Sequence, residues 1–184
     1  LILRGDVSLG LGQAEGAFTV KAAAELKAGV LGRFLGHWMI QSRLPYLNES
    51  ALYVNQQPVY DENWRNPLVN EIGVEWEVEK QDFRAGITWI VHDNFIYFDT
   101  MPRPRQIGES FSIRRFHVSK GFDFRWLALE GRVIWQPDTR SELALPGLLY
   151  TASVYGRVRL FDRKVTLVPG WHITYHDGTT GVRY

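Results

Sequence analysis

Hydrophobic and polar residues alternate along most of the chain, and the 3.6-residue period of an amphipathic helix is almost absent. The clearest example runs from Leu68 to Val78, where every second residue is apolar except Asn70. Strict alternation predicts a β-strand with one apolar and one polar face. Weaker alternation predicts three earlier strands, at about residues 2–11, 17–27 and 33–42.

The strand at 68–78 has a natural partner directly after it. Alternation resumes at Phe83 and continues to residue 91. If Lys80-Gln81 is a turn, Ile72 lies opposite Trp89 and Glu77 lies opposite Arg84. The apolar faces of the two strands then coincide, whereas a slip by one residue would place them on opposite sides. The sequence therefore predicts an antiparallel hairpin in this register.

The end of the chain passes the same test. Folding it back across Asp162-Arg163 pairs Tyr150 with Tyr175 and gathers the apolar residues of both strands on one face. This predicts a second hairpin, in which Val158 also faces Leu167.

A third hairpin is predicted between residues 111–118 and 122–135. Ser119-Lys120-Gly121 would form its three-residue loop, with glycine where a positive φ angle is usually needed. The alternation slips near Arg114-Arg115 and near Trp126-Leu127, which we interpret as β-bulges.

The connections between these strands are of two kinds. Tight turns are predicted after Lys80, Ser119 and Asp162, whereas residues 43–67, 93–109 and 137–147 form long loops that hold seven of the eight prolines. Because short and long connections alternate, all long loops lie at one end of the sheet. One of them is expected to fold inward.

About nine strands of roughly ten to fourteen residues fit two architectures. A soluble β-sandwich or lipocalin-like barrel has shorter strands and turns its apolar face inward. A transmembrane barrel turns its apolar face to lipid and its charged face to a wet lumen. The many charges on the polar face favour the second, so we expect an all-β antiparallel transmembrane β-barrel. Residues 1–184 would form one segment of a larger barrel.

Composition narrows the class further. Mean hydropathy is −0.20, and no stretch approaches the ~18 consecutive apolar residues of a membrane helix. The formal charge of +1 does not favour nucleic acid as a partner. Aromatic residues make up 14% of the chain, and a barrel concentrates them at both ends of its apolar band. The candidates for this aromatic girdle are Trp38, Phe83, Trp89, Phe122, Trp135, Tyr150, Phe161 and Tyr175.

The polar face supplies the candidate lumen-lining residues. They are Glu71, Glu75, Glu77, Glu79, Arg84, His92, Arg157, Arg159 and His172. The four glutamates form an acidic row that could bind cations or select ions. The alternative is a wetted face neutralised by Arg84 and other basic residues on neighbouring strands.

The sequence offers little support for catalysis or a cofactor. His172 and His176 are about 13 Å apart on an extended strand, too far to share a metal ion. The chain has no cysteine and no nucleophile motif of the G-x-S-x-G type. We expect no enzyme activity, no metal and no cofactor. The aromatic residues of loop 93–109 could anchor that loop or stack on a sugar.

Two loop regions resemble a known family. They are the run DNFIYFDTMPRPRQ, through Asn94, Ile96, Tyr97, Phe98, Pro104 and Gln106, and the region holding Gln136, Leu145, Pro146 and Tyr150. These features are similar to the putative porins of Bacteroidetes-type outer membranes. The resemblance implies an outer-membrane β-barrel several hundred residues long, longer than this chain, that passes small solutes.

The expected function is therefore passive diffusion of small polar solutes or ions through a charged lumen. A non-transporting barrel subunit of a larger outer-membrane complex and a soluble ligand-binding β-barrel remain alternatives. The expected location is the bacterial outer membrane, crossed many times. The expected partners are the lipid bilayer, lipopolysaccharide, the solutes, and other subunits of an oligomer or complex, without nucleic acid.

Overall fold

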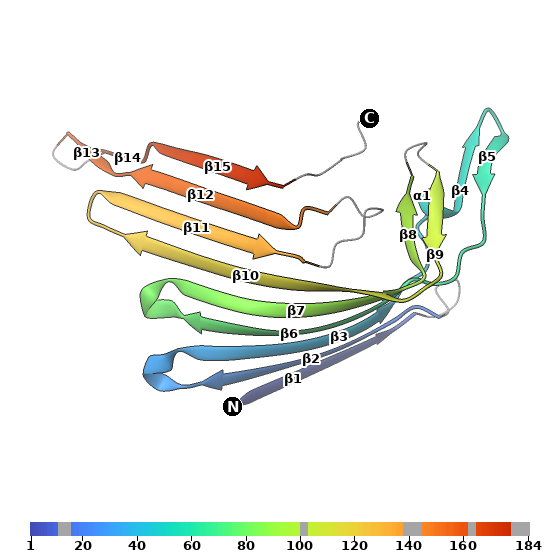
Figure 1. Cartoon of the computed structure of the whole chain (residues 1–184), viewed down its shortest axis with the longest axis horizontal. Coiled ribbons are helices and arrows are strands. Elements are labelled where there is room, and N and C mark those ends of the chain that lie inside the picture. The colour runs from blue at the N-terminus through green and yellow to red at the C-terminus, as the bar shows by residue number, and fades with distance from the viewer. Residues whose placement is uncertain (11–15, 100–102, 138–144, 162–164, 178–184) are drawn as a thin grey trace.

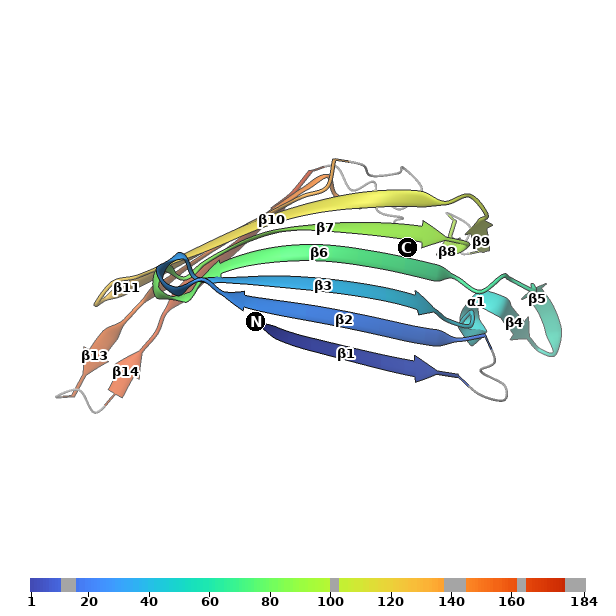
Figure 2. The same ribbon diagram turned by 90° about the horizontal axis from the view of Figure 1, so that it is seen from below.

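Nine long strands form a single curved antiparallel sheet in the computed structural model (Figures 1 and 2), which describes residues 1–10, 16–99, 103–137, 145–161 and 165–177. The strands are β1 (Ile2–Leu9), β2 (Phe18–Lys27), β3 (Arg33–Ser42), β6 (Leu68–Val78), β7 (Phe83–Asp93), β10 (Phe111–Asp123), β11 (Leu127–Trp135), β12 (Leu148–Gly156) and β15 (Gly170–His176). They lie in this order across the sheet, with β1 and β15 at its edges. The described sheet is open rather than closed into a barrel.

The strand pairings confirm two of the three predicted hairpins. Ile72 lies opposite Trp89 and Glu77 opposite Arg84, while Tyr150 lies opposite Tyr175. The connection after β6 is longer than a two-residue turn, because η3 (Glu79–Gln81) is a 3-10 turn followed by Asp82 in the left-handed region. Asp162 and Arg163 lie outside the described residues.

The third predicted hairpin has the right strands but the wrong turn. Gly121 lies inside β10, directly opposite Glu130, and the chain reverses after Asp123, where Phe124 donates a backbone hydrogen bond to Leu127. Gly121 lies beside the turn that connects β6 to β7 and donates a backbone hydrogen bond to the Asp82 carbonyl. A Cβ there would lie 1.7 Å from an Asp82 carboxylate oxygen, so Gly121 makes room for the neighbouring turn.

The predicted bulges in this hairpin are also wrong. The register between β10 and β7 is constant from Phe111 to Lys120, so the alternation continues through Arg114-Arg115. Arg114 therefore lies on the same face as Trp89, among apolar residues. Trp126 belongs to the turn itself, and β11 begins at Leu127.

Three small hairpins extend from the ends of the main sheet. They are formed by β4 (Ala51–Val54) with β5 (Gln57–Asp61), β8 (Phe95–Phe98) with β9 (Pro104–Ile107), and β13 (Val158–Leu160) with β14 (Val165–Leu167). The first two occupy loops that the sequence analysis left without strands. The short helix α1 (Leu47–Ser50) precedes β4, and η2 (Gly29–Leu31) connects β2 to β3.

The loop that carries β4 and β5 is anchored by a buried ion pair. The two terminal nitrogens of the Arg43 guanidinium, Nη1 and Nη2, donate to the Glu49 carboxylate at 2.7 and 2.8 Å, and the Tyr46 amide donates to the same carboxylate at 2.7 Å. Trp64 donates its indole N–H to the Glu49 carbonyl. The base of the loop is therefore rigidly connected.

Every second residue of a strand shares a face, so the register defines two surfaces of the sheet. Residues that are paired directly opposite each other lie on the same face. The apolar face is the face of Trp76 and its partners across the sheet, and the polar face is the face of Glu77 and its partners. Among the described residues, no helix is long and apolar enough to cross a membrane.

Gly32 offers a test of the β2–β3 turn. It has a φ of +91°, and a Cβ there would lie 2.1 Å from the Glu77 carbonyl oxygen. We expect Gly32→Ala to destabilise the fold by about 2 kcal/mol or more. Gly36→Ala is the control, because nothing lies within 4 Å of its Cβ position. Unfolding followed by circular dichroism measures both, and equal midpoints would contradict the described turn.

The Arg43–Glu49 pair predicts a pH-dependent loop. Burial would raise the pKa of Glu49, but the hydrogen bonds from Arg43 and the Tyr46 amide lower it below the ordinary 4.5. A lowered pKa stabilises the folded loop above the ordinary carboxyl range, and that stabilisation is lost as pH falls through it.

Hydrogen exchange of residues 44–50, corrected for its intrinsic pH dependence, measures this loss of order. Glu49→Gln is expected to raise exchange at neutral pH and to abolish its further rise at acidic pH. Glu62 is exposed and serves as the control through Glu62→Gln. Unchanged protection in Glu49→Gln would show that the ion pair does not hold the loop.

Candidate functional site

The burial of the two faces is the reverse of that in a soluble β-protein. On the apolar face, Ile72, Val74 and Trp89 are each 52% exposed, whereas on the polar face Glu77 is only 5% and Thr88 only 8% exposed. The polar side chains gather on one side of a curved sheet and shield one another from solvent, while the large apolar side chains on the other side are exposed. A contiguous apolar surface of this kind marks an interaction with membrane or protein.

The acidic residues of β6 contact basic side chains on other strands. The Glu77 carboxylate accepts a hydrogen bond from Arg33 on β3, at 2.7 Å, and one from Arg84 on β7, at 3.1 Å. Glu71 and Glu75 each contact a histidine. Each described glutamate of the strand therefore has a basic partner, and the pairs of Glu77 with the two arginines are the ones with permanent opposite charges.

Two histidines reach these glutamates across glycines. His37 lies directly opposite Gly73, and its Nε2 is 3.0 Å from Glu71. His117 lies opposite Gly86, and a Cβ at Gly86 would be 2.4 Å from the His117 ring. Its Nε2 is 3.1 Å from Glu75. The glycines let each ring lie flat on the sheet, a requirement that alternation alone does not indicate.

The structure brings six of the predicted lumen residues onto one surface. They are Glu71, Glu75, Glu77, Arg84, His92 and His172, all on the polar face. Glu79 is a correction, because it lies in the turn η3 rather than on the strand, so the acidic row is one residue shorter than expected. Arg157 follows β12 and forms a bidentate pair with Asp123 at 2.6 and 2.8 Å. The Arg159 side chain lies outside the described part of the chain.

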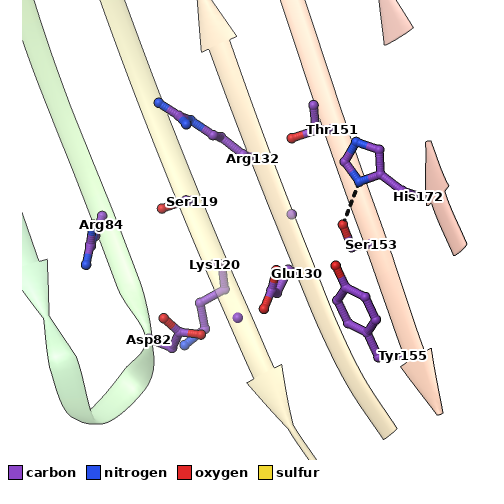
Figure 3. A pocket seen from close by; sticks show the side chains of 12 residues that line it. Asp82, Arg84, Ser119, Lys120, Glu130, Arg132, Thr151, Ser153, Tyr155 and His172 are labelled. Atoms are coloured by element: carbon purple, nitrogen blue, oxygen red, sulfur yellow. Dashed lines mark hydrogen bonds between the residues drawn. The ribbon is translucent and has the colours of Figure 1, made fainter. Parts of the chain in front are cut away.

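A groove of about 410 Å³ opens on the polar face between β7 and β15 (Figure 3). Charged and hydroxyl side chains line it, including Arg84, Arg132 and Glu130. His172 Nδ1 is 2.8 Å from the Ser153 hydroxyl at one wall. The groove thus offers many separate hydrogen-bond donors and acceptors.

One part of the polar face is apolar, and the sequence analysis missed it. Ile90 and Ile113 lie directly opposite each other there and are 6% and 3% exposed. Above them the His92 ring stacks on Phe111, with centroids 5.2 Å apart, and both rings contact Phe95. The sequence does indicate this patch, because alternation fails near the end of β7, where residues 89–91 are all apolar and therefore place apolar side chains on both faces.

His92 therefore packs instead of lining an open channel. Its Nδ1 is buried and has no hydrogen-bond partner among the described residues. The prediction that loop 93–109 uses aromatic anchors is supported at Phe95, whose contacts are with rings of the sheet.

Two glutamines from the family-like loop motifs tie the loops together. The Gln106 Nε2 donates to the carbonyls of Arg65, at 2.7 Å, and Asn94, at 3.0 Å. Gln136 is buried, accepts a hydrogen bond from Arg115, and donates to the Pro146 carbonyl at 3.2 Å. These side chains satisfy loop carbonyls that the strands leave free.

Most of the predicted girdle residues lie on the apolar face. They are Trp38, Phe83, Trp89, Phe122, Trp135, Tyr150 and Tyr175, while Phe161 follows β13 at a strand end and is 74% exposed. The strand register thus places these seven aromatic side chains, Phe161 apart, on the same apolar face.

The polar face offers no evident centre for metal chemistry. Across the described ranges of the chain, no three His, Cys, Asp or Glu side chains gather closely enough to hold a metal ion. The face instead carries paired charges, hydroxyl groups and imidazole rings.

Comparison with known proteins adds an independent finding. No curated protein and no solved structure matches the chain. A family model described as putative porin matches residues 1–178. This match covers nearly the whole chain, which therefore belongs to the putative porin family.

Proposed function

We propose that this chain forms part of the wall of an outer-membrane β-barrel through which small polar solutes and ions diffuse passively. The observation that carries the proposal is the reversed burial of the sheet. Its apolar face suits the lipid bilayer and the lipid part of lipopolysaccharide, and its polar face suits a water-filled lumen. A soluble barrel would instead bury the apolar face as its core.

The stagger of the strands supports closure into a barrel. One row of directly paired residues crosses seven strands, through Lys27, Arg33, Glu77, Arg84, Ser119, Arg132 and Thr151. On the turn side of this row β2 does not extend, and β6 extends one residue to Val78. β10 extends four residues to Asp123, and β12 extends five residues to Gly156.

Five residues over six strand steps is about 0.8 residue per strand. With about 3.3 Å per residue and 4.8 Å between strands, this corresponds to a tilt of about 30°, slightly below the roughly 35–45° that is typical of barrels. Closure would pair the edges β1 and β15 with further strands.

The family supports the same function at a coarser level, since its members are described as putative porins. Passive diffusion requires no catalytic residue, and the paired charges of the polar face would give weak ion preference. Other subunits of an oligomer or complex would contact the apolar face or the loops.

Reconstitution tests the pore directly. We expect the purified full-length protein, with the complete barrel of which this chain would form part, to produce stepwise conductance when it is inserted into a planar bilayer from detergent. Silence from correctly folded protein would contradict the pore and favour a non-transporting subunit of an outer-membrane complex. Recovery of folded protein without detergent would contradict the membrane location itself.

Ion preference tests the polar face. Glu71→Gln combined with Glu75→Gln removes two acidic charges without disturbing Glu77, whose burial between two arginines makes it structural. We expect the cation-to-anion permeability ratio to fall at least about twofold, measured as a reversal potential in a salt gradient.

The matched control for this variant is Glu79→Gln. Glu79 belongs to the turn η3, beyond the end of β6, so its removal should change the ratio much less. An unchanged reversal potential in the double variant, or an equal shift in the control, would show that the polar face does not line the conduction path.

A further inference from the structure

The β8–β9 hairpin leaves the sheet in a defined direction. It begins directly after β7, separated only by Asn94, which has a φ of +53°. Asparagine tolerates this left-handed conformation, which turns the chain sharply. Figure 1 shows the hairpin rising from the ends of β7 and β10, across the strand direction and toward the level of β11 and β12, and Figure 2 places it at the same strand ends.

The base of the hairpin packs on the polar face. Phe95, its first residue, lies 5.1 Å from the His92 ring and 5.7 Å from the Phe111 ring, measured between centroids. His92 and Phe111 are paired across β7 and β10, on the same face as Glu77. The hairpin is thus turned to the side of the sheet that the proposed pore assigns to its lumen.

The buried apolar side chains concentrate at this base. Of the five hydrophobic residues that are buried in the described structure, Ile90, Ile96, Phe111 and Ile113 lie in or beside the hairpin's attachment, and the fifth, Val78, lies at the opposite end of β6. Apolar residues on a water-facing surface would be unfavourable without a cover. The hairpin therefore has its own small core.

Gln106 fixes the hairpin from the second strand. Its amide makes a two-way contact with Arg65, donating to the carbonyl at 2.7 Å and accepting from the backbone N–H at 3.2 Å. A third hydrogen bond, to the Asn94 carbonyl, connects the second strand of the hairpin to the residue that precedes the first. The Ser110 hydroxyl also donates to Asp93, where β10 approaches β7.

We propose that the β8–β9 hairpin is the fixed constriction of the pore, and that it sets the upper size of the solutes that pass. This inference rests on the proposed pore function and adds to it the element that limits passage. The buried apolar residues at its base and the three hydrogen bonds of Gln106 hold the hairpin in place. It would therefore narrow the mouth of the pore permanently instead of opening and closing.

Shortening the hairpin tests this inference. Phe95 lies directly opposite Ile107, so a two-residue Asn-Gly link can replace residues 96–106 while keeping the cluster of His92, Phe95 and Phe111. We expect single-channel conductance to rise at least about twofold. Liposome swelling should show entry of neutral sugars too large for the unmodified protein.

The β4–β5 hairpin provides the matched control. Ala51 lies opposite Asp61, so the same link can replace residues 52–60. The β4–β5 hairpin rises on the same side as β8–β9 in Figure 1 but lies farther beyond the strand ends in Figure 2, so we expect a smaller rise in conductance than after shortening β8–β9. Unchanged conductance and size limit after shortening β8–β9 would overturn the inference, as would an equal rise in the control. Absence of conductance in the unmodified protein would contradict the pore function as well, so the two failures are distinguishable.

A cysteine experiment keeps the test valid if the shortened chain fails to fold. The protein has no native cysteine, so a single thiol reacts uniquely. Arg105 is an exposed residue of β9, and Gln57 is an exposed residue of β5. Attaching a bulky thiol reagent to Arg105→Cys should lower conductance to about two thirds or less of its value before labelling, while Gln57→Cys should be unaffected. Complete labelling at Arg105→Cys without a conductance change would overturn the inference.

Discussion

The register of β6 between its two neighbours is the constraint on which the rest of the structure depends. Side chains alternate with a period of two, so a slip of one residue would exchange the faces of the whole strand. Three glutamates would then stand on the apolar face. In the proposed barrel that face would contact lipid, where an Arg or Lys side chain costs about 2–4 kcal/mol and a carboxylate somewhat less. Three misplaced glutamates would therefore remove a substantial part of the roughly 5–15 kcal/mol that typically stabilises a domain.

The same register determines the electrostatics of the polar face. Glu77 is almost fully buried, and a buried carboxylate is tolerated only when other groups satisfy it. Arg33 and Arg84 reach it because they lie directly opposite it on both sides. Charges that are paired this closely have weak fields at a distance, so a lumen lined in this way would discriminate ions only modestly.

The sequence predicted the long-range pairing well because two-face alternation is a strong signal. Ile72 with Trp89 and Tyr150 with Tyr175 followed from matching apolar faces. The third hairpin was misplaced because Gly121 was interpreted as a turn residue. Its true role, giving space to the Asp82 side chain, depends on a neighbouring turn that the local sequence does not specify.

The candidate site was predictable to the same extent and for the same reason. Alternation placed Glu71, Glu75 and Glu77 on one face, but it could not reveal their partners on β3 and β10. Glu79 was assigned to that row because the strand's end depends on where the turn begins. The hairpins inside the long loops were missed because Pro58 and Pro104 discouraged a strand assignment, although proline is acceptable at the start or edge of a strand.

At the end of the sheet that carries the long loops, apolar residues interrupt the polar face beside the β8–β9 hairpin. Ile90 and Ile113 are the wrong residues for a water-facing surface, and their burial contributes about 1.5–3 kcal/mol each when they are covered. The β8–β9 hairpin packs at this position and adds the ring contacts of Phe95. A hairpin of two short strands is marginal by itself in water. The hairpin and the apolar patch therefore stabilise each other. The corresponding sequence feature is the unbroken apolar run at residues 89–91 together with the opposite phase of the alternation at residues 111–113, which places Phe111 and Ile113 on the polar face.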